Sequence, residues 1–313
     1  MSKDYIALFP GQGSQSLGML GEGAFADGSD QKIIKDCFDI ASDILDEDLW
    51  DIVCNDQDKL NQTVYTQPIM LCADIAIWNV WLKYTDKKPV ACAGHSLGEY
   101  AALVCAESIK FSDAILLVRK RAELMQTAVT GRETQMAAII GLDANKIREI
   151  CKDIQEKSGC VSVANYNSAL QTVIAGEKNA VMDACAKCKE SGAKLAKPLA
   201  VSVPSHCSLL EGAANKFSDF LSDFQVDTPK MPVYFNVNAQ NKSMQKDIIN
   251  AMVSQIYSPV NWVQTIESIN NEFDDVKFLE FGPGKVLTGL NKRIISDGDF
   301  SAINSSESMQ GVL

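Results

Sequence analysis

Residues Val90–Cys105 read VACAGHSLGEYAALVC, which is a short apolar run, a serine between two glycines and a second apolar run. The first run has the length of a buried strand, and the second is typical of a buried helix. A serine can occupy a strained turn here because neither flanking glycine carries a Cβ that would clash. The stretch predicts a strand–turn–helix unit with Ser96 as candidate nucleophile, and the alternative is a tight turn without a catalytic role. The N–H of Leu97 would be a free donor for an oxyanion.

The composition limits the class of protein. The chain has 313 residues, of which 46% are hydrophobic, and a net charge of −11. This charge argues against nucleic acid as a partner, and no apolar run reaches the ~18 residues that span a membrane.

Ten cysteines at scattered apolar positions, without an export signal, predict reduced thiols and a cytoplasmic protein. Cys185 and Cys188 lack a second pair, so we expect no metal site. The polar tail after Ser301 is expected to be flexible.

A change of pattern marks residues 130–198 as an inserted domain. Apolar periodicity there predicts strand, helix, strand, strand, helix and strand in turn, at Met136–Ile140, Ala144–Glu156, Cys160–Asn165, Gln171–Ala175, Asn179–Glu190 and Ala196–Val201. This order is that of the ferredoxin-like unit, a compact two-layer domain. Elsewhere strands alternate with helices, beginning with a strand at Tyr5–Phe9 and ending with a helix from Lys285, which indicates an α/β fold.

An arginine interrupts the apolar face of the helix that follows the Ser96 unit. The positions on that face are Ala114, Leu117, Arg121, Leu124 and Ala128. A buried guanidinium without an acceptor is costly, so Arg121 needs a negatively charged or polar partner. One of the chain's own carboxylates would serve, and so would a carboxylate of a substrate.

His206 is the candidate base. The chain has two histidines, and His95 is expected to point away from the reacting serine. Ser208–Glu211 fits a capping box, which would place His206 just before a helix and keep its imidazole neutral. An unperturbed imidazole predicts that activity falls with acid near pH ~6–7. Gln255 lies in the last turn of a predicted helix, where a free main-chain carbonyl can orient an imidazole.

Five separated elements together resemble one family. They are Gly11–Gln15 (GQGSQ), Gly94–Tyr100 (GHSLGEY), Arg121, Pro204–His206 (PSH) and Gln255. In identity and spacing they are similar to those of the malonyl-CoA:acyl carrier protein transacylases. The resemblance runs from the first strand to the last glycine-rich loop, and it fits the free-standing enzymes of type II fatty acid synthesis.

The resemblance implies a fold and an activity. Residues 1–129 and 199–313 would form an α/β-hydrolase-like catalytic domain, into which the ferredoxin-like domain of residues 130–198 is inserted. The implied enzyme is an [acyl-carrier-protein] S-malonyltransferase. It would move the malonyl group from malonyl-CoA to the phosphopantetheine thiol of acyl carrier protein by ping-pong transfer. We expect no cofactor beyond the coenzyme A thioester substrate, and a monomer.

The resemblance also implies roles for the site residues. Ser96 would attack the thioester while His206 takes its proton. The backbone N–H groups of Leu97 and Gln12 would hold the oxyanion. The main-chain carbonyl of Gln255 would orient the histidine, in place of the aspartate that hydrolases usually use.

Two other classes of function remain open. A serine hydrolase such as a thioesterase would share the Ser96 turn but would not need Arg121. A non-catalytic scaffold that binds an acyl carrier would need neither.

We expect Arg121 to bind the free carboxylate of the malonyl group, because a planar guanidinium pairs with a carboxylate through two hydrogen bonds.

A carrier protein must find basic residues on this acidic chain, because the family's carrier is itself acidic. Two clusters are candidates for its docking site: Lys187, Lys189, Lys194 and Lys197 in the inserted domain, and Lys285, Lys292 and Arg293 near the C-terminus. Either cluster could equally be a solvated face.

Overall fold

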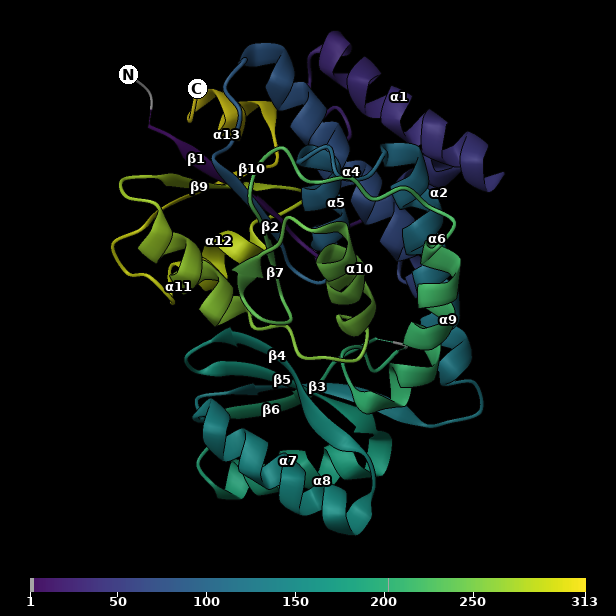
Figure 1. Ribbon diagram of the computed structural model, residues 1–313, viewed down its shortest axis with the longest axis vertical. Coiled ribbons are helices and arrows are strands. Elements are labelled where there is room, and N and C mark those ends of the chain that lie inside the picture. Colours follow the sequence, from purple (N-terminus) through teal and green to yellow (C-terminus); the bar gives the residue numbers. More distant parts are fainter. Residues whose placement is uncertain (1–2, 202) are drawn as a thin grey trace.

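Two β-sheets organise the computed structural model, which describes residues 3–201 and 203–313 (Figure 1). The first two residues of the predicted catalytic range, and Ser202, lie outside the described residues. The larger sheet is parallel except at one edge, and its strands in spatial order are β10 (Asp299–Ile303), β9 (Lys277–Phe281), β1 (Tyr5–Phe9), β2 (Ala91–Gly94), β7 (Val233–Phe235) and the antiparallel β8 (Gln240–Asn241).

Helices cover both faces of the larger sheet. Alternate residues of β1 enter two cores, since Tyr5 and Phe9 pack on one face and Ile6 and Leu8 on the other. The helices on the first face are α1 (Gly28–Leu45), α2 (Leu49–Asn55), α3 (Gln57–Leu60), α4 (Thr63–Tyr84), α5 (Gly98–Cys105), α6 (Phe111–Ala128), α9 (Glu211–Leu221), α10 (Gln245–Ser254) and α13 (Ser306–Gln310). Those on the second face are α11 (Trp262–Glu272) and α12 (Val286–Asn291).

The second sheet lies below the larger one in Figure 1 and is antiparallel throughout. Its strands in spatial order are β4 (Val161–Ser168), β5 (Gln171–Glu177), β3 (Thr134–Ile140) and β6 (Leu195–Pro198). The helices α7 (Ala144–Ser158) and α8 (Lys178–Glu190) cover the face turned away from the larger sheet. This order is that of a ferredoxin-like unit, and the predicted fold class is confirmed.

The C-terminal expectation was wrong. The helix near Lys285 is α12, and it is followed by β10 and α13 rather than by a flexible tail. Strand β10 pairs in parallel with β9 from Asp299 to Ile303, and Met309 of α13 is buried in the large core. The strand is short and half polar, so its sequence lacks the apolar run that marks the central strands. Only its pairing with β9 identifies it.

Candidate active site

The turn that carries Ser96 depends on two close backbone contacts. Ser96 connects β2 to α5 with φ of 53°, in the left-handed region that L-residues rarely adopt. A Cβ on Gly94 would lie 1.9 Å from the carbonyl carbon of Gly98. A Cβ on Gly98 would lie 2.1 Å from the main-chain oxygen of Phe9. The two glycines are therefore required by space, as the sequence pattern predicted, and they let the serine turn pack directly on the end of β1.

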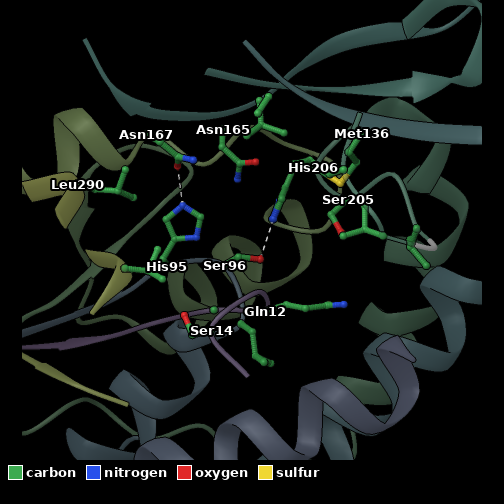
Figure 2. A pocket seen from close by; sticks show the side chains of 18 of the residues that line it. Gln12, Ser14, His95, Ser96, Met136, Asn165, Asn167, Ser205, His206 and Leu290 are labelled. Carbon is green, nitrogen blue, oxygen red and sulfur yellow. Dashed lines mark hydrogen bonds between the residues drawn. The ribbon is translucent and has the colours of Figure 1, made fainter. Parts of the chain in front are cut away.

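Ser96 and His206 meet inside a cavity, as Figure 2 shows. Ser96 Oγ lies 2.7 Å from His206 Nε2, and His206 Nδ1 lies 2.7 Å from the main-chain oxygen of Gln255. Because a carbonyl oxygen can only accept, Nδ1 carries the ring proton and Nε2 presents its lone pair to the serine hydroxyl. In this geometry the imidazole can accept the Ser96 hydroxyl proton, and the main chain fixes its tautomer.

Two main-chain N–H groups are free beside Ser96. Neither Leu97 N nor Gln12 N donates to an acceptor in the part of the chain that the structure describes. Both residues line the cavity. The Gln12 loop approaches the serine turn closely, since a Cβ on Gly11 would lie 2.5 Å from the main-chain oxygen of His95. These unused donors can bind a negatively charged oxygen.

Arg121 lies next to Ser96 and has neutral partners. Its side chain on α6 is 1% exposed. Nη1 donates to Gln67 Oε1 at 2.9 Å, and Nη2 donates to Gln255 Oε1 at 2.8 Å and to Ser96 Oγ at 3.3 Å. Among the described residues no carboxylate forms an ion pair with it, so the alternative of a partner carboxylate from this chain is not realised. Its Nε is buried without a partner in the same residues.

Sequence reasoning missed the network that supports this arrangement. Gln255 Nε2 donates to Glu99 Oε2 at 2.6 Å and to the main-chain oxygen of Ser96 at 2.8 Å. Asn236, just beyond β7, donates its main-chain N–H to Glu99 and accepts from Ser96 N at 2.6 Å. Burial raises the pKa of Glu99 to about 8, while hydrogen bonds and the charge of Arg121 oppose the shift. One signal was present, since Glu99 is the single charge in the apolar helix α5.

The cavity lies between the two domains and measures about 260 Å³. The large domain contributes Ser96, His206 and Arg121 to its wall. The small domain contributes the residues Met136, Ala138, Asn165, Asn167, Gln171 and Val173. Mixed polar and apolar walls of this kind suit a small polar group on an apolar chain.

His95 has a role that the sequence did not suggest. Its Nε2 lies 2.8 Å from Asn167 Oδ1, and its ring packs on Trp262 with centroids 5.3 Å apart. Figure 2 shows the ring directed toward Asn167 rather than toward Ser96 Oγ. The expectation that it points away from the reacting serine agrees with this view. His95 nevertheless lines the cavity and connects the serine turn to the small domain.

The predicted capping box at Ser208–Glu211 was wrong. A short 3₁₀ turn (Ser208–Leu210) precedes α9, and the Ser208 hydroxyl contacts Cys160 Sγ at 3.3 Å instead of capping a helix. Burial, followed by the positive charge of Arg121, lowers the pKa of His206 to about 3. The imidazole is therefore kept neutral by its surroundings and not by a helix end.

The described residues contain no group of three or more His, Cys, Asp or Glu side chains arranged to hold a metal ion. None of their helices has both the length and the apolar character that crossing a membrane requires.

The chain is similar to acyltransferases over nearly its whole length. The family model for the acyl transferase domain matches residues 6–300. A malonyl CoA-acyl carrier protein transacylase of Haemophilus influenzae is 46% identical, with 99% of this chain and 98% of the relative covered. The malonyl-transacylase solved in complex with a type II PKS acyl-carrier protein is 45% identical, with a TM-score of 0.93 and 99% of both chains covered. The malonyl CoA-acyl carrier protein transacylase of Coxiella burnetii is 42% identical, with a TM-score of 0.94 and 99% and 97% covered.

The lowered pKa of His206 predicts that Ser96 stays nucleophilic in acid. Phenylmethanesulfonyl fluoride is a neutral reagent that reacts with Ser96 only when the His206 imidazole is neutral. Its reaction rate therefore reports the protonation state of His206 without the use of a charged substrate. We expect the rate of modification to decrease only at a pH well below 6, as the pH approaches the His206 pKa of about 3. In Arg121→Gln the positive charge is gone, so the pKa of His206 rises and the fall moves to higher pH. A wild-type midpoint near pH ~6.5, the ordinary imidazole value, would contradict the role of burial. Circular dichroism at each pH checks that the protein remains folded.

Proposed function

This chain belongs to the malonyl CoA-acyl carrier protein transacylases and transfers malonyl from malonyl-CoA to acyl carrier protein for fatty acid synthesis, and we propose that Ser96 carries the malonyl group between two half-reactions. One observation carries this proposal. Ser96 Oγ lies 2.7 Å from His206 Nε2 and 3.3 Å from Arg121 Nη2, so a base and an unpaired cation face the same hydroxyl.

In the first half-reaction Ser96 Oγ attacks the thioester carbonyl, and His206 Nε2 accepts the hydroxyl proton. The carbonyl oxygen becomes an oxyanion, which the free N–H groups of Leu97 and Gln12 are available to bind. When the intermediate collapses, His206 returns the proton to the sulfur and coenzyme A leaves. The product is a malonyl ester on Ser96.

The second half-reaction uses the same groups in reverse. The thiol of the carrier's phosphopantetheine gives its proton to His206 and attacks the ester carbonyl. The tetrahedral intermediate again places its oxyanion at the N–H groups of Leu97 and Gln12. Collapse releases the malonyl thioester of the carrier and returns the proton to Ser96 Oγ. Throughout, the carbonyl of Gln255 holds Nδ1–H of the imidazole, which keeps Nε2 available.

Arg121 selects the acyl group in this proposal. In the ester on Ser96 the malonyl carboxylate is only a few bonds from Oγ, which places it within reach of the guanidinium. The hydrogen bonds to Gln67, Gln255 and Ser96 use three of the five N–H groups of Arg121, so two donors remain for a carboxylate. An acetyl group would fit the space but leave the buried cation unpaired, which penalises acetyl transfer by about 3 kcal/mol.

We propose that this chemistry needs no metal or redox cofactor, because a serine, an imidazole and main-chain N–H groups supply every proton and charge that the steps require.

We also propose that the enzyme works in the cytoplasm. All ten cysteines are free thiols, which suits a reducing compartment. The monomeric state remains a prediction.

The C-terminal basic cluster is the better docking site for the acidic carrier. Leu287 and Leu290 of α12 line the cavity, and Arg293 donates to Gln171 Oε1 at 2.9 Å at its edge. The other cluster includes Lys187 on α8, which packs on the face of the small sheet turned away from the cavity. A carrier held at α12 therefore brings its prosthetic group to Ser96 over a shorter path.

Intact-mass analysis after incubation with malonyl-CoA tests the covalent intermediate. We expect wild type to gain one malonyl group that persists without carrier and disappears when carrier is added. Ser96→Ala should gain none, since it lacks the nucleophile. Thioesterase activity would instead appear as steady release of coenzyme A without carrier, and a scaffold would show neither adduct nor release. An adduct on Ser96→Ala would place the nucleophile elsewhere.

Charge reversal tests the docking site. Lys285→Glu with Lys292→Glu should slow malonyl transfer to carrier about tenfold at low salt, because the acidic carrier then meets a repulsive surface. Formation of the acyl-enzyme from malonyl-CoA should be unchanged, since Ser96 is untouched. The matched control is Lys187→Glu with Lys189→Glu, which should behave as wild type. If only the control pair loses transfer, the carrier docks at α8.

A further inference from the structure

Glu99 is a buried acidic residue that the two half-reactions do not use. It lies in the first turn of α5, shortly after Ser96 in the chain. Its side chain is 1% exposed, and it is not one of the described residues that line the cavity. Burial of an ionisable side chain is costly unless hydrogen bonds satisfy its oxygens, so the partners of Glu99 indicate its role.

Each carboxyl oxygen of Glu99 accepts a hydrogen bond from a different part of the site. Oε1 accepts from the main-chain N–H of Asn236, whose side-chain oxygen in turn accepts from Ser96 N at 2.6 Å. Oε2 accepts from Gln255 Nε2 at 2.6 Å. One carboxyl group thus joins the residue that holds the serine turn to the residue that contacts both the imidazole and Arg121.

Three neighbours determine which way the Gln255 side-chain amide faces. Its Oε1 accepts from Arg121 Nη2 at 2.8 Å. Its Nε2 donates to Glu99 Oε2 and, at 2.8 Å, to the main-chain oxygen of Ser96. A reversed amide would turn a donor toward the guanidinium and an acceptor toward two oxygens. Donors and acceptors therefore match in only one of the two orientations.

We propose that Glu99 is a positioning residue for malonyl selection, which holds the Gln255 amide with its oxygen toward Arg121. A neutral oxygen then fixes the position of the guanidinium, and the cation remains available for a carboxylate. Glu99 acts through Gln255 and does not touch the acyl group. This inference rests on the proposed role of Arg121 in binding the malonyl carboxylate.

The substitution Glu99→Gln changes one of the two acceptors into a donor. The main-chain N–H of Asn236 cannot turn, because the carbonyl of the same residue accepts from Asn261 N at 3.0 Å. We therefore expect the oxygen of the new amide to face Asn236 and its NH₂ group to face Gln255 Nε2. Two donors in contact are unfavourable. The Gln255 side chain can rotate away from this contact, and Arg121 then loses an oriented acceptor.

The ratio of kcat/KM for malonyl-CoA to kcat/KM for acetyl-CoA tests the proposal. In Glu99→Gln we expect this ratio to fall about tenfold or more, which is the loss typical of one hydrogen bond to a charged group. Phenylmethanesulfonyl fluoride should still modify Ser96 at neutral pH, because the hydrogen bond that supports the serine turn is kept. Glu123→Gln is the matched control. Glu123 lies on the same helix as Arg121 but pairs with Arg119 at 3.0 Å, so its substitution should keep the wild-type ratio.

The exchange variant Glu99→Gln with Gln255→Glu separates positioning from stability. The NH₂ group at position 99 then faces one carboxylate oxygen, and the other oxygen of that carboxylate accepts from Arg121. We expect this variant to regain part of the melting temperature that Glu99→Gln loses. The preference for malonyl should stay low, because Arg121 now has a counter-ion. The carbonyl of residue 255 belongs to the main chain and still orients His206.

The other outcomes each contradict a stated part of this account. An unchanged ratio in Glu99→Gln, or an equal loss for both thioesters, would exclude the positioning role. Return of the wild-type ratio in the exchange variant would make Glu99 a structural residue only. An equal loss for both thioesters in Arg121→Ala would overturn the proposed function and this inference together, whereas a selective loss there without one in Glu99→Gln overturns the inference alone. Should Glu99→Gln fail to fold, the exchange variant is compared with wild type in the same assays.

Discussion

The site depends on a buried positive charge that is held by neutral groups. Arg121 is 1% exposed, and its hydrogen bonds go to two amide oxygens and a hydroxyl. Gln67 lies on α4 and Gln255 follows α10, so two helices that are far apart in the sequence together position Arg121. Desolvation without a counter-ion is unfavourable, and a carboxylate arriving from outside relieves it. Burial, and after it the same charge, lowers the pKa of His206. Arg121 thus contributes both to the selectivity that we propose and to the neutral state of the imidazole.

The Gln255 residue connects these functions. Its main-chain oxygen accepts from His206 Nδ1, while its side chain accepts from Arg121 and donates to Glu99. The amide therefore stands between the guanidinium and the carboxyl of Glu99. A direct ion pair there would satisfy the arginine and remove its need for a substrate carboxylate. The neutral amide keeps the cation in position without satisfying its charge.

Much of this arrangement could be predicted from the sequence. The glycines around Ser96, the β-α-β-β-α-β order and the arginine in an apolar face are local patterns, and local patterns are what a sequence displays. The contacts of Gln67, Glu99 and Asn236 join distant segments, so no spacing reveals them. The low pKa of His206 is likewise a property of burial. Strand β10 was missed because it is short and half polar, and its partner β9 defines it.

The central claim is that Arg121 binds the malonyl carboxylate. Comparison of kcat/KM for malonyl-CoA with kcat/KM for acetyl-CoA tests this claim most directly. Arg121→Ala should lose malonyl transfer about 100-fold or more, equivalent to ~3 kcal/mol, while acetyl transfer is retained or rises. Arg121→Lys should recover little, because an ammonium lacks the planar fork. Arg119→Ala is the matched control, since Arg119 pairs with Glu47 and should not affect the preference. If Arg121→Ala lowers kcat/KM for both substrates by the same factor, the residue is structural and the account is wrong.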